Sequence, residues 1–279
     1  MLRLSANLGF LWADRPLLSR LDCAAAAGFG AVELHWPYDV DPSAVRQACG
    51  ALGLDLVCIN APGGNLKDEF GFAAVAGREA DFRSSVAQAC DYAQRAGARA
   101  IHVLAGSVGP AQRASAEETF LRNIREASLR AEEQGLSILL EALNPVDRPG
   151  YFYHTTDEVA RLIAELGRPN VRLMFDVYHV ARAEGDVTRR LERHLPIIGH
   201  VQIAGVPNRT EPDRGEIAYG HVFRVLEQLG YEGFVGCEYH PRGDIEEGLS
   251  WVEACGVSLA RAVAEGSRGG SRTTAAQAG

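Results

Sequence analysis

Eight short runs of apolar, largely β-branched residues alternate with eight longer stretches of helical periodicity, from one end of the chain to the other. Strands that are joined through a helix return to the same end of a sheet, so they run parallel and their crossovers are right-handed. Eight parallel strands close naturally into a barrel. The sequence therefore predicts one α/β domain with the (β/α)8 TIM barrel architecture.

The expected strands are the apolar runs at residues 3–8, 31–36, 55–60, 100–104, 137–142, 171–177, 199–204 and 234–239. The expected helices are the periodic stretches at residues 16–27, 42–52, 78–96, 116–134, 156–166, 186–194, 219–229 and 245–264. Ser115 and Glu118 have the spacing of a capping box, which predicts that the fourth helix begins there.

The chain of 279 residues suits a single barrel, and no interior stretch is rich enough in Pro, Gly or Ser to divide it. Residues 266–279 contain no large apolar side chain. We therefore expect a barrel domain over residues 1–265 and a disordered tail over residues 266–279. Residues 61–77 form a long connection between a strand and a helix, which is typical of a lid or binding loop.

Composition excludes several other classes of protein. Hydrophobic residues make up 47% of the chain and charged residues 23%, which supports a packed core. A net charge of -8 gives no overall positive field for a nucleic-acid backbone, and no apolar stretch approaches the roughly 20 residues that cross a membrane. The first residues form a strand-like pattern, and the six cysteines show no CxxC pair. We therefore expect a cytoplasmic protein without nucleic-acid or membrane partners.

Polar residues end four consecutive predicted strands, and in such a barrel these ends meet at the catalytic face. They are Glu141, Asp176, Gln202 and Glu238. An acid that follows buried residues is unfavourable unless it is paired or bound to a metal. Each could instead form a structural ion pair with an arginine or point into solvent, but the repetition in adjacent strands favours one shared site.

All four side chains offer oxygen, and no Cys or His pair accompanies them. Oxygen donors favour a hard divalent ion, so the sequence predicts Mg²⁺ or Mn²⁺ rather than structural zinc. Four protein ligands leave about two positions on an octahedral ion, enough to chelate a hydroxyl and the neighbouring carbonyl. An α-hydroxycarbonyl substrate would fit this opening.

Several segments resemble the hydroxypyruvate isomerase family, within the xylose-isomerase-like barrels that also include ketose 3-epimerases. They are MLRLSANLGFLW, VELHWPYD, LLEALNPVDRPGYF, FDVYHVARAEGD, GHVQIAGVPNRTEPDRGEI and VGCEYHP, and the likeness runs to about residue 253. The resemblance implies a divalent metal held by the four strand-end residues above. It also implies that Glu141 and Glu238 exchange protons with the substrate.

By the same resemblance, His179 and Arg209 contact substrate oxygens or the substrate's carboxylate. This chain departs from the family's pattern at three places near the expected mouth: the loop PGGNLKDEF replaces a Gly-Asp-Trp element, Gly205 replaces an Asp, and His240 replaces a basic residue. These departures leave the identity of the substrate open. Glu33, which ends the second predicted strand, is open between bonding a substrate hydroxyl and holding a neighbouring loop.

The leading hypothesis is an aldose–ketose-type isomerase of carbohydrate metabolism. It would interconvert a small hydroxy-oxo acid through a metal-stabilised cis-enediolate, with hydroxypyruvate to tartronate semialdehyde as reference reaction and 2-oxo-tetronate isomerisation as a close variant. A ketose 3-epimerase acting on free ketoses and a non-catalytic barrel that binds a sugar acid are the alternatives. The resemblance also allows a homo-oligomer, whose stoichiometry no sequence feature fixes.

Overall fold

The computed structural model of the chain describes residues 2–67 and 69–259. Its strands form a closed parallel barrel in sequence order, with β1 paired to β8, which confirms the predicted architecture. The strands are β1 (Arg3–Asn7), β2 (Ala31–Leu34), β3 (Asp55–Asn60), β4 (Ala100–His102), β5 (Ser137–Glu141), β6 (Val171–Asp176), β7 (Ile198–Ile203) and β8 (Phe234–Cys237).

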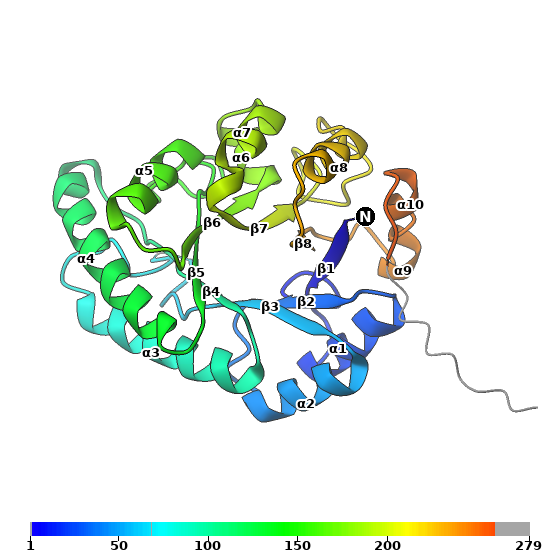
Figure 1. The fold of residues 1–279 in the computed structure, drawn as a ribbon, viewed down its shortest axis with the longest axis horizontal. Helices are drawn as coiled ribbons and strands as arrows, with labels where there is room; N and C mark the ends of the chain where they lie inside the picture. Colours follow the sequence, from blue (N-terminus) through cyan, green and yellow to red (C-terminus); the bar gives the residue numbers. More distant parts are fainter. Residues whose placement is uncertain (1, 68, 260–279) are drawn as a thin grey trace, which may run out of the picture.

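Helices lie around the outside of the strands (Figure 1). They are α1 (Leu17–Ala26), α2 (Pro42–Leu52), α3 (Glu79–Ala96), α4 (Arg113–Glu132), α5 (Thr156–Leu166), α6 (Val177–Ala183), α7 (Val187–His194), α8 (Tyr219–Gln228), α9 (Ile245–Gly248) and α10 (Trp251–Ala254), with short 3-10 turns η1 (Pro110–Gln112) and η2 (Leu195–Ile197). Within the part of the chain described, no helix is both long and apolar enough to span a membrane.

Two helix predictions are wrong in detail. Ser115 lies inside α4, where its hydroxyl donates to the Gln112 carbonyl at 2.9 Å, and the capping box is instead formed by Thr155 and Glu158 at α5. The expected last helix is divided into the short helices α9 and α10, and its final residues, like the predicted tail, lie outside the described residues.

Helix α6 is a third difference, because the sequence did not predict it. The apolar run of β6 continues directly into α6 without a loop. The Asp176 carboxylate accepts the backbone N–H of Tyr178 at 2.9 Å and so caps this helix. Asp176 is therefore both the last residue of β6 and the N-cap of α6, and this hydrogen bond fixes its side chain.

The barrel interior changes from apolar to polar along its axis. Four buried residues of β3 to β6 form an apolar cluster separate from the main core: Cys58, Ala100, Leu139 and Met174. Side chains two positions apart on a strand point to the same face. The interior positions that follow Ala100, Leu139 and Met174 are therefore His102, Glu141 and Asp176, which places polar groups at the carboxyl ends of the strands.

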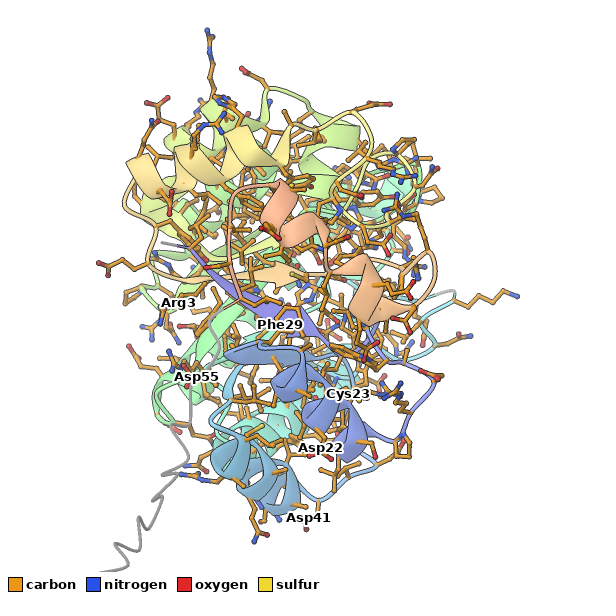
Figure 2. All side chains as sticks on the ribbon, turned by 90° about the vertical axis from the view of Figure 1, so that its right-hand side faces the viewer. Arg3, Asp22, Cys23, Phe29, Asp41 and Asp55 are labelled. Carbon is orange, nitrogen blue, oxygen red and sulfur yellow. The ribbon has the colours of Figure 1, made fainter. Side chains whose placement is uncertain are left out.

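Figure 2 shows on which side of the molecule the strands begin. In Figure 2, the labelled Arg3 and Asp55, the first residues of β1 and β3, lie toward the same side of the molecule. The strands start on that side and end on the opposite one. The polar end of the interior is therefore the carboxyl face, where TIM barrels place their active sites.

Candidate active site

The structure brings the four strand-end residues together. Glu141 and Asp176 end β5 and β6, Gln202 lies next to last in β7, and Glu238 directly follows β8. Backbone pairing places Asp176 level with Gln202. All four side chains are buried. This placement fits the prediction that the four residues share one site. Their roles as metal ligands and proton-transfer groups stay a prediction.

A cavity of about 710 Å³ is lined by three of these residues, Glu141, Gln202 and Glu238. Its volume lies within the usual range of small-molecule sites, roughly 300–1,000 Å³. Its walls combine aromatic rings with charged and imidazole side chains, among them Phe10, His35, Trp36, Phe70, His102, Glu141, Arg148, Tyr178, His179, Gln202, Arg209, Glu238 and His240. The expected loop contributes Leu66 and Phe70, so the predicted binding loop does reach the cavity.

Two of the three buried carboxylates share one arginine. The Arg209 guanidinium lies 3.0 Å from Glu238 Oε1 and 3.4 Å from Asp176 Oδ2. Glu141 Oε1 has no hydrogen-bond partner among the described residues, and the nearest imidazole nitrogen to its other oxygen, that of His102, is 3.5 Å away. The cluster therefore holds more negative charge than its neighbours compensate.

The pKa values follow this imbalance. Burial, with the nearby Glu238 and Asp176 charges, raises the pKa of Glu141 well above its usual range, and burial raises the pKa of Asp176 to about 7. Burial would also raise the pKa of Glu238, but Arg209 and the hydrogen bond from His35 outweigh it and lower the value to about 2. Of the two glutamates expected to transfer protons, Glu141 thus lies where the protonated form is favoured, and Glu238 lies where the carboxylate is favoured.

His179 is held in one tautomer. Its Nδ1 atom accepts the backbone N–H of Asn144 at 3.1 Å, so the ring proton belongs on Nε2. That nitrogen lies 3.7 Å from Asp176 Oδ2 and 3.8 Å from Glu141 Oε1. Burial lowers the pKa of His179 well below its usual range, so the ring is neutral. Its Nε2–H group can donate one hydrogen bond at the cavity wall, and the expected substrate contact stays a prediction.

Arg209 reaches the site from the loop after β7. The loop is closed by the Gly205 N–H, which donates to the Thr210 carbonyl at 2.7 Å, and the His240 N–H donates to the Arg209 carbonyl at 2.7 Å. A Cβ atom at position 205 would lie 2.6 Å from the Glu211 carbonyl oxygen. The glycine that departs from the family's pattern is therefore required by the tight fold of this loop.

The donor set fits a divalent cation. The three acids are buried, and Gln202 Oε1 is a further buried oxygen without a hydrogen-bond partner in residues 2–67 and 69–259. Glu141 and Asp176 each offer an oxygen within 4.8 Å of the other, while His179 beside them directs its Nε2 proton, not a lone pair, toward these acids. Buried carboxylates and amide oxygens that the protein leaves unpaired are the ligands that hard cations prefer.

The sequence reasoning missed several residues at this site. His35 and His102 lie at or just after the ends of β2 and β4, so the rule that identified the later strand ends would have found them. Asp147 and Arg148 come from the loop after β5, where no spacing signals them. Arg148 packs its guanidinium 3.8 Å from the centre of the Phe70 ring, at the cavity wall.

Comparison with known proteins places this geometry in context. The family described as "Xylose isomerase-like TIM barrel" matches residues 21–255. A 2-oxo-tetronate isomerase of Cupriavidus necator is 42% identical over 255 residues, covering 91% of this chain and 98% of the relative. The hydroxypyruvate isomerase of Escherichia coli is 37% identical over 256 residues, covering 91% and 99%.

Solved structures show the same fold. A Brucella melitensis protein named AP endonuclease, family 2, superposes with a TM-score of 0.88 at 41% identity, covering 91% of this chain and 99% of that one. The 3-keto-D-glucoside 4-epimerase of Escherichia coli has a TM-score of 0.79 at 19% identity, covering 91% and 100%. The second likeness concerns the fold alone.

Proposed function

Because this chain belongs to the xylose isomerase-like TIM barrel family, we propose that its buried mouth acids catalyse the isomerisation of a small hydroxy-oxo acid. The chain is an isomerase, since its isomerase relatives match over nearly their whole length. The specific reaction that we propose is hydroxypyruvate to tartronate semialdehyde, or the related isomerisation of a 2-oxo-tetronate. In either reaction a proton leaves the hydroxyl-bearing carbon and one returns to the neighbouring carbonyl carbon.

One observation carries this proposal: Glu141 and Glu238 approach the same cavity from strands three places apart in the ring, both buried. A carboxylate positioned in this way can remove a proton from a bound carbon acid, and a carboxylic acid can return one. One glutamate would take the proton from the hydroxyl-bearing carbon, and the same group or its partner would return it to the adjacent carbon.

Other side chains would bind and orient the substrate. The Nε2–H group of His179 would donate to a substrate oxygen, and the Arg209 guanidinium would pair with the substrate's carboxylate. Glu141, Asp176, Gln202 and Glu238 would hold a divalent ion, Mg²⁺ or Mn²⁺. When bound, such an ion supplies positive charge beside the substrate oxygens, worth several kcal/mol in lowering the barrier to proton removal.

A small molecule is the proposed partner rather than nucleic acid. The chain has a net charge of -8, and its mouth cavity concentrates carboxylates rather than a basic stripe. The substrate's own negative charge would meet Arg209 and Arg148 at the cavity wall.

A substrate panel tests the reaction class. Purified protein with Mn²⁺ is incubated with hydroxypyruvate, 2-oxo-tetronates and free ketoses, and the products are identified by NMR. Conversion of a three- or four-carbon oxo-acid is the expected result. Turnover of free hexuloses without activity on the acids would instead assign a ketose 3-epimerase, and Mn²⁺ binding without turnover of any compound would assign a non-catalytic barrel.

A further inference from the structure

A second cluster of buried polar side chains, built around one carboxylate, lies inside the barrel and includes Gln202. Its centre is Glu33 of β2, which is 1% exposed. Glu33 Oε1 accepts the Ser5 hydroxyl at 2.6 Å, and Oε2 accepts the Gln202 amide at 2.8 Å and the Asn7 amide at 3.4 Å. His200 Nε2 lies 2.9 Å from Oε1. We call these five residues the inner cluster.

The contact with Gln202 determines which end of its amide faces the proposed cation site. A carboxylate offers only acceptors, so the amide must present its nitrogen to Glu33 and its oxygen elsewhere. Gln202 Oε1 is buried and, among the described residues, has no hydrogen-bond partner. Gln202 is level with Asp176 in the sheet, and its side chain lines the mouth cavity.

We propose that Glu33 is a positioning residue that orients the Gln202 amide so that its oxygen is presented to a divalent cation at the barrel mouth. The inference rests on the proposed function, because the cation site is part of that function. It assigns to Glu33 neither of the two roles that the sequence left open. Glu33 acts through Gln202, and it touches neither substrate nor ion.

The neighbouring strand is shaped around this carboxylate. Gly236 of β8 is paired with both Ser5 and Gln202. A Cβ atom at position 236 would lie 2.1 Å from Glu33 Oε1. Any side chain there would displace the carboxylate, so β1, β7 and β8 together leave room for this one group.

A cation bound by the inner cluster itself is the competing reading. Glu33, Cys58 and His200 offer atoms that lie within 4.8 Å of one another. Both Glu33 oxygens already accept hydrogen bonds, and burial raises the pKa of the Cys58 thiol well above its usual range. The geometry therefore favours an orienting carboxylate over a ligand, and the experiment below separates the two.

The test is calorimetric titration of the metal-free protein with Mn²⁺ alone. Glu33→Gln replaces a pure acceptor by an amide that accepts or donates, so Gln202 is no longer held in one orientation. We expect Mn²⁺ affinity to fall about 10- to 100-fold, as for other residues that orient metal ligands, with one site per chain retained. Gln202→Ala leaves no amide to orient, so in this background Glu33→Gln should cause little further loss of affinity, whereas a direct effect of the Glu33 charge on the cation would persist.

Ser128→Ala is the control for loss of hydrogen bonds of a buried side chain, because this α4 hydroxyl donates to the Arg125 carbonyl and accepts from the Arg168 guanidinium, away from the barrel interior. It should lower the melting temperature without changing Mn²⁺ affinity. Wild-type affinity in Glu33→Gln, or an equal loss from Glu33→Gln in the Gln202→Ala background, would overturn the inference alone. A wild-type stoichiometry of two ions that falls to one in Glu33→Gln would identify Glu33 as a ligand and also overturn it. A wild-type protein that binds no Mn²⁺ would overturn the proposed cation site together with the inference.

Discussion

The inner cluster and the acids at the barrel mouth show two ways of burying carboxylates in one barrel. Glu33 is a single acid that accepts three hydrogen bonds and lies beside an imidazole. We call Glu141, Asp176 and Glu238 the mouth cluster. Asp176 and Glu238 share the Arg209 guanidinium, and Glu141 Oε1 has no hydrogen-bond partner in the described part of the chain. Both oxygens of Glu33 are hydrogen-bonded, although His200 Nε2 beside them is unpaired, so the fold can satisfy a buried carboxylate. The unpaired oxygen of Glu141 at the mouth therefore supports the proposed cation site.

Gln202 joins the two clusters. Its nitrogen completes the hydrogen bonding of Glu33, and its oxygen belongs to the set of unpaired groups at the mouth. The comparison therefore predicts that substitutions in the mouth cluster act mainly on chemistry and cation binding. Substitutions in the inner cluster should act on stability and, through Gln202, on the cation.

Glu238→Gln is expected to have the largest effect. The amide keeps the size of the side chain but cannot exchange the proton, so kcat should fall about 100- to 10,000-fold. Circular dichroism should stay close to that of the wild type, but the melting temperature should fall modestly, because the variant loses the ion pair of Glu238 with Arg209 that lowers the pKa of this acid. Near-normal turnover by this variant would remove Glu238 from the proton-transfer step.

Asp176→Asn should weaken cation binding at least about tenfold, because affinity for hard cations depends on the number of charged ligands. An asparagine oxygen can still accept the Tyr178 N–H, so α6 should keep its cap. The metal content after exhaustive dialysis, measured by atomic absorption, checks the expectation. A content equal to that of the wild type would count against Asp176 as a ligand.

Gly236→Ala probes the inner cluster from the backbone. The new methyl group would meet Glu33 Oε1, and we expect a loss of about 1–3 kcal/mol in the free energy of unfolding. Gly50→Ala is the matched control, because a Cβ at this helical position meets nothing within 4 Å. Urea unfolding measures the free energy of unfolding of both variants. Equal values would show that the inner cluster can accommodate a methyl group at position 236.

The smallest expected effect is a pH dependence of the metal-free protein. Burial raises the pKa of Asp176 to about 7, above its value in the unfolded chain, so the folded state holds the proton more tightly. The stability contribution of this group is complete below about pH 4 and is lost as the pH rises through about 7. In EDTA, the melting temperature of the wild type should therefore fall between pH 5 and 8 relative to that of Asp176→Asn. The same pH dependence of the melting temperature in both proteins would contradict a raised pKa of Asp176.

Local patterns predicted the barrel because the alternation of strand and helix periods, and the parallel connections it implies, are properties of neighbouring residues. The same reasoning brought Glu141, Asp176, Gln202 and Glu238 to one end of the barrel. It failed at α6, because the apolar run before His179 continues from strand into helix without a turn residue to mark the change.

The inner cluster was beyond prediction for a different reason. Glu33 meets Gln202 across 169 positions of sequence, and no spacing along the chain encodes which side chains face each other inside a closed barrel. The strand-end rule did single out Glu33, but as an acid near the mouth that would bond a substrate hydroxyl or hold a neighbouring loop. The role that we propose for Glu33 follows only from the orientation of the Gln202 amide and from the space that Gly236 leaves beside the carboxylate.

The most direct test of the central claim is solvent deuterium exchange at the substrate carbon. Hydroxypyruvate and a 2-oxo-tetronate are incubated in D₂O with wild-type protein that is first stripped by EDTA and then reloaded with Mn²⁺, and NMR follows the hydroxyl-bearing and neighbouring carbons. The account predicts deuterium at these carbons with Mn²⁺, little with EDTA, and none above background with Glu238→Gln. Exchange that proceeds equally without the metal, or equally in Glu238→Gln, would contradict it.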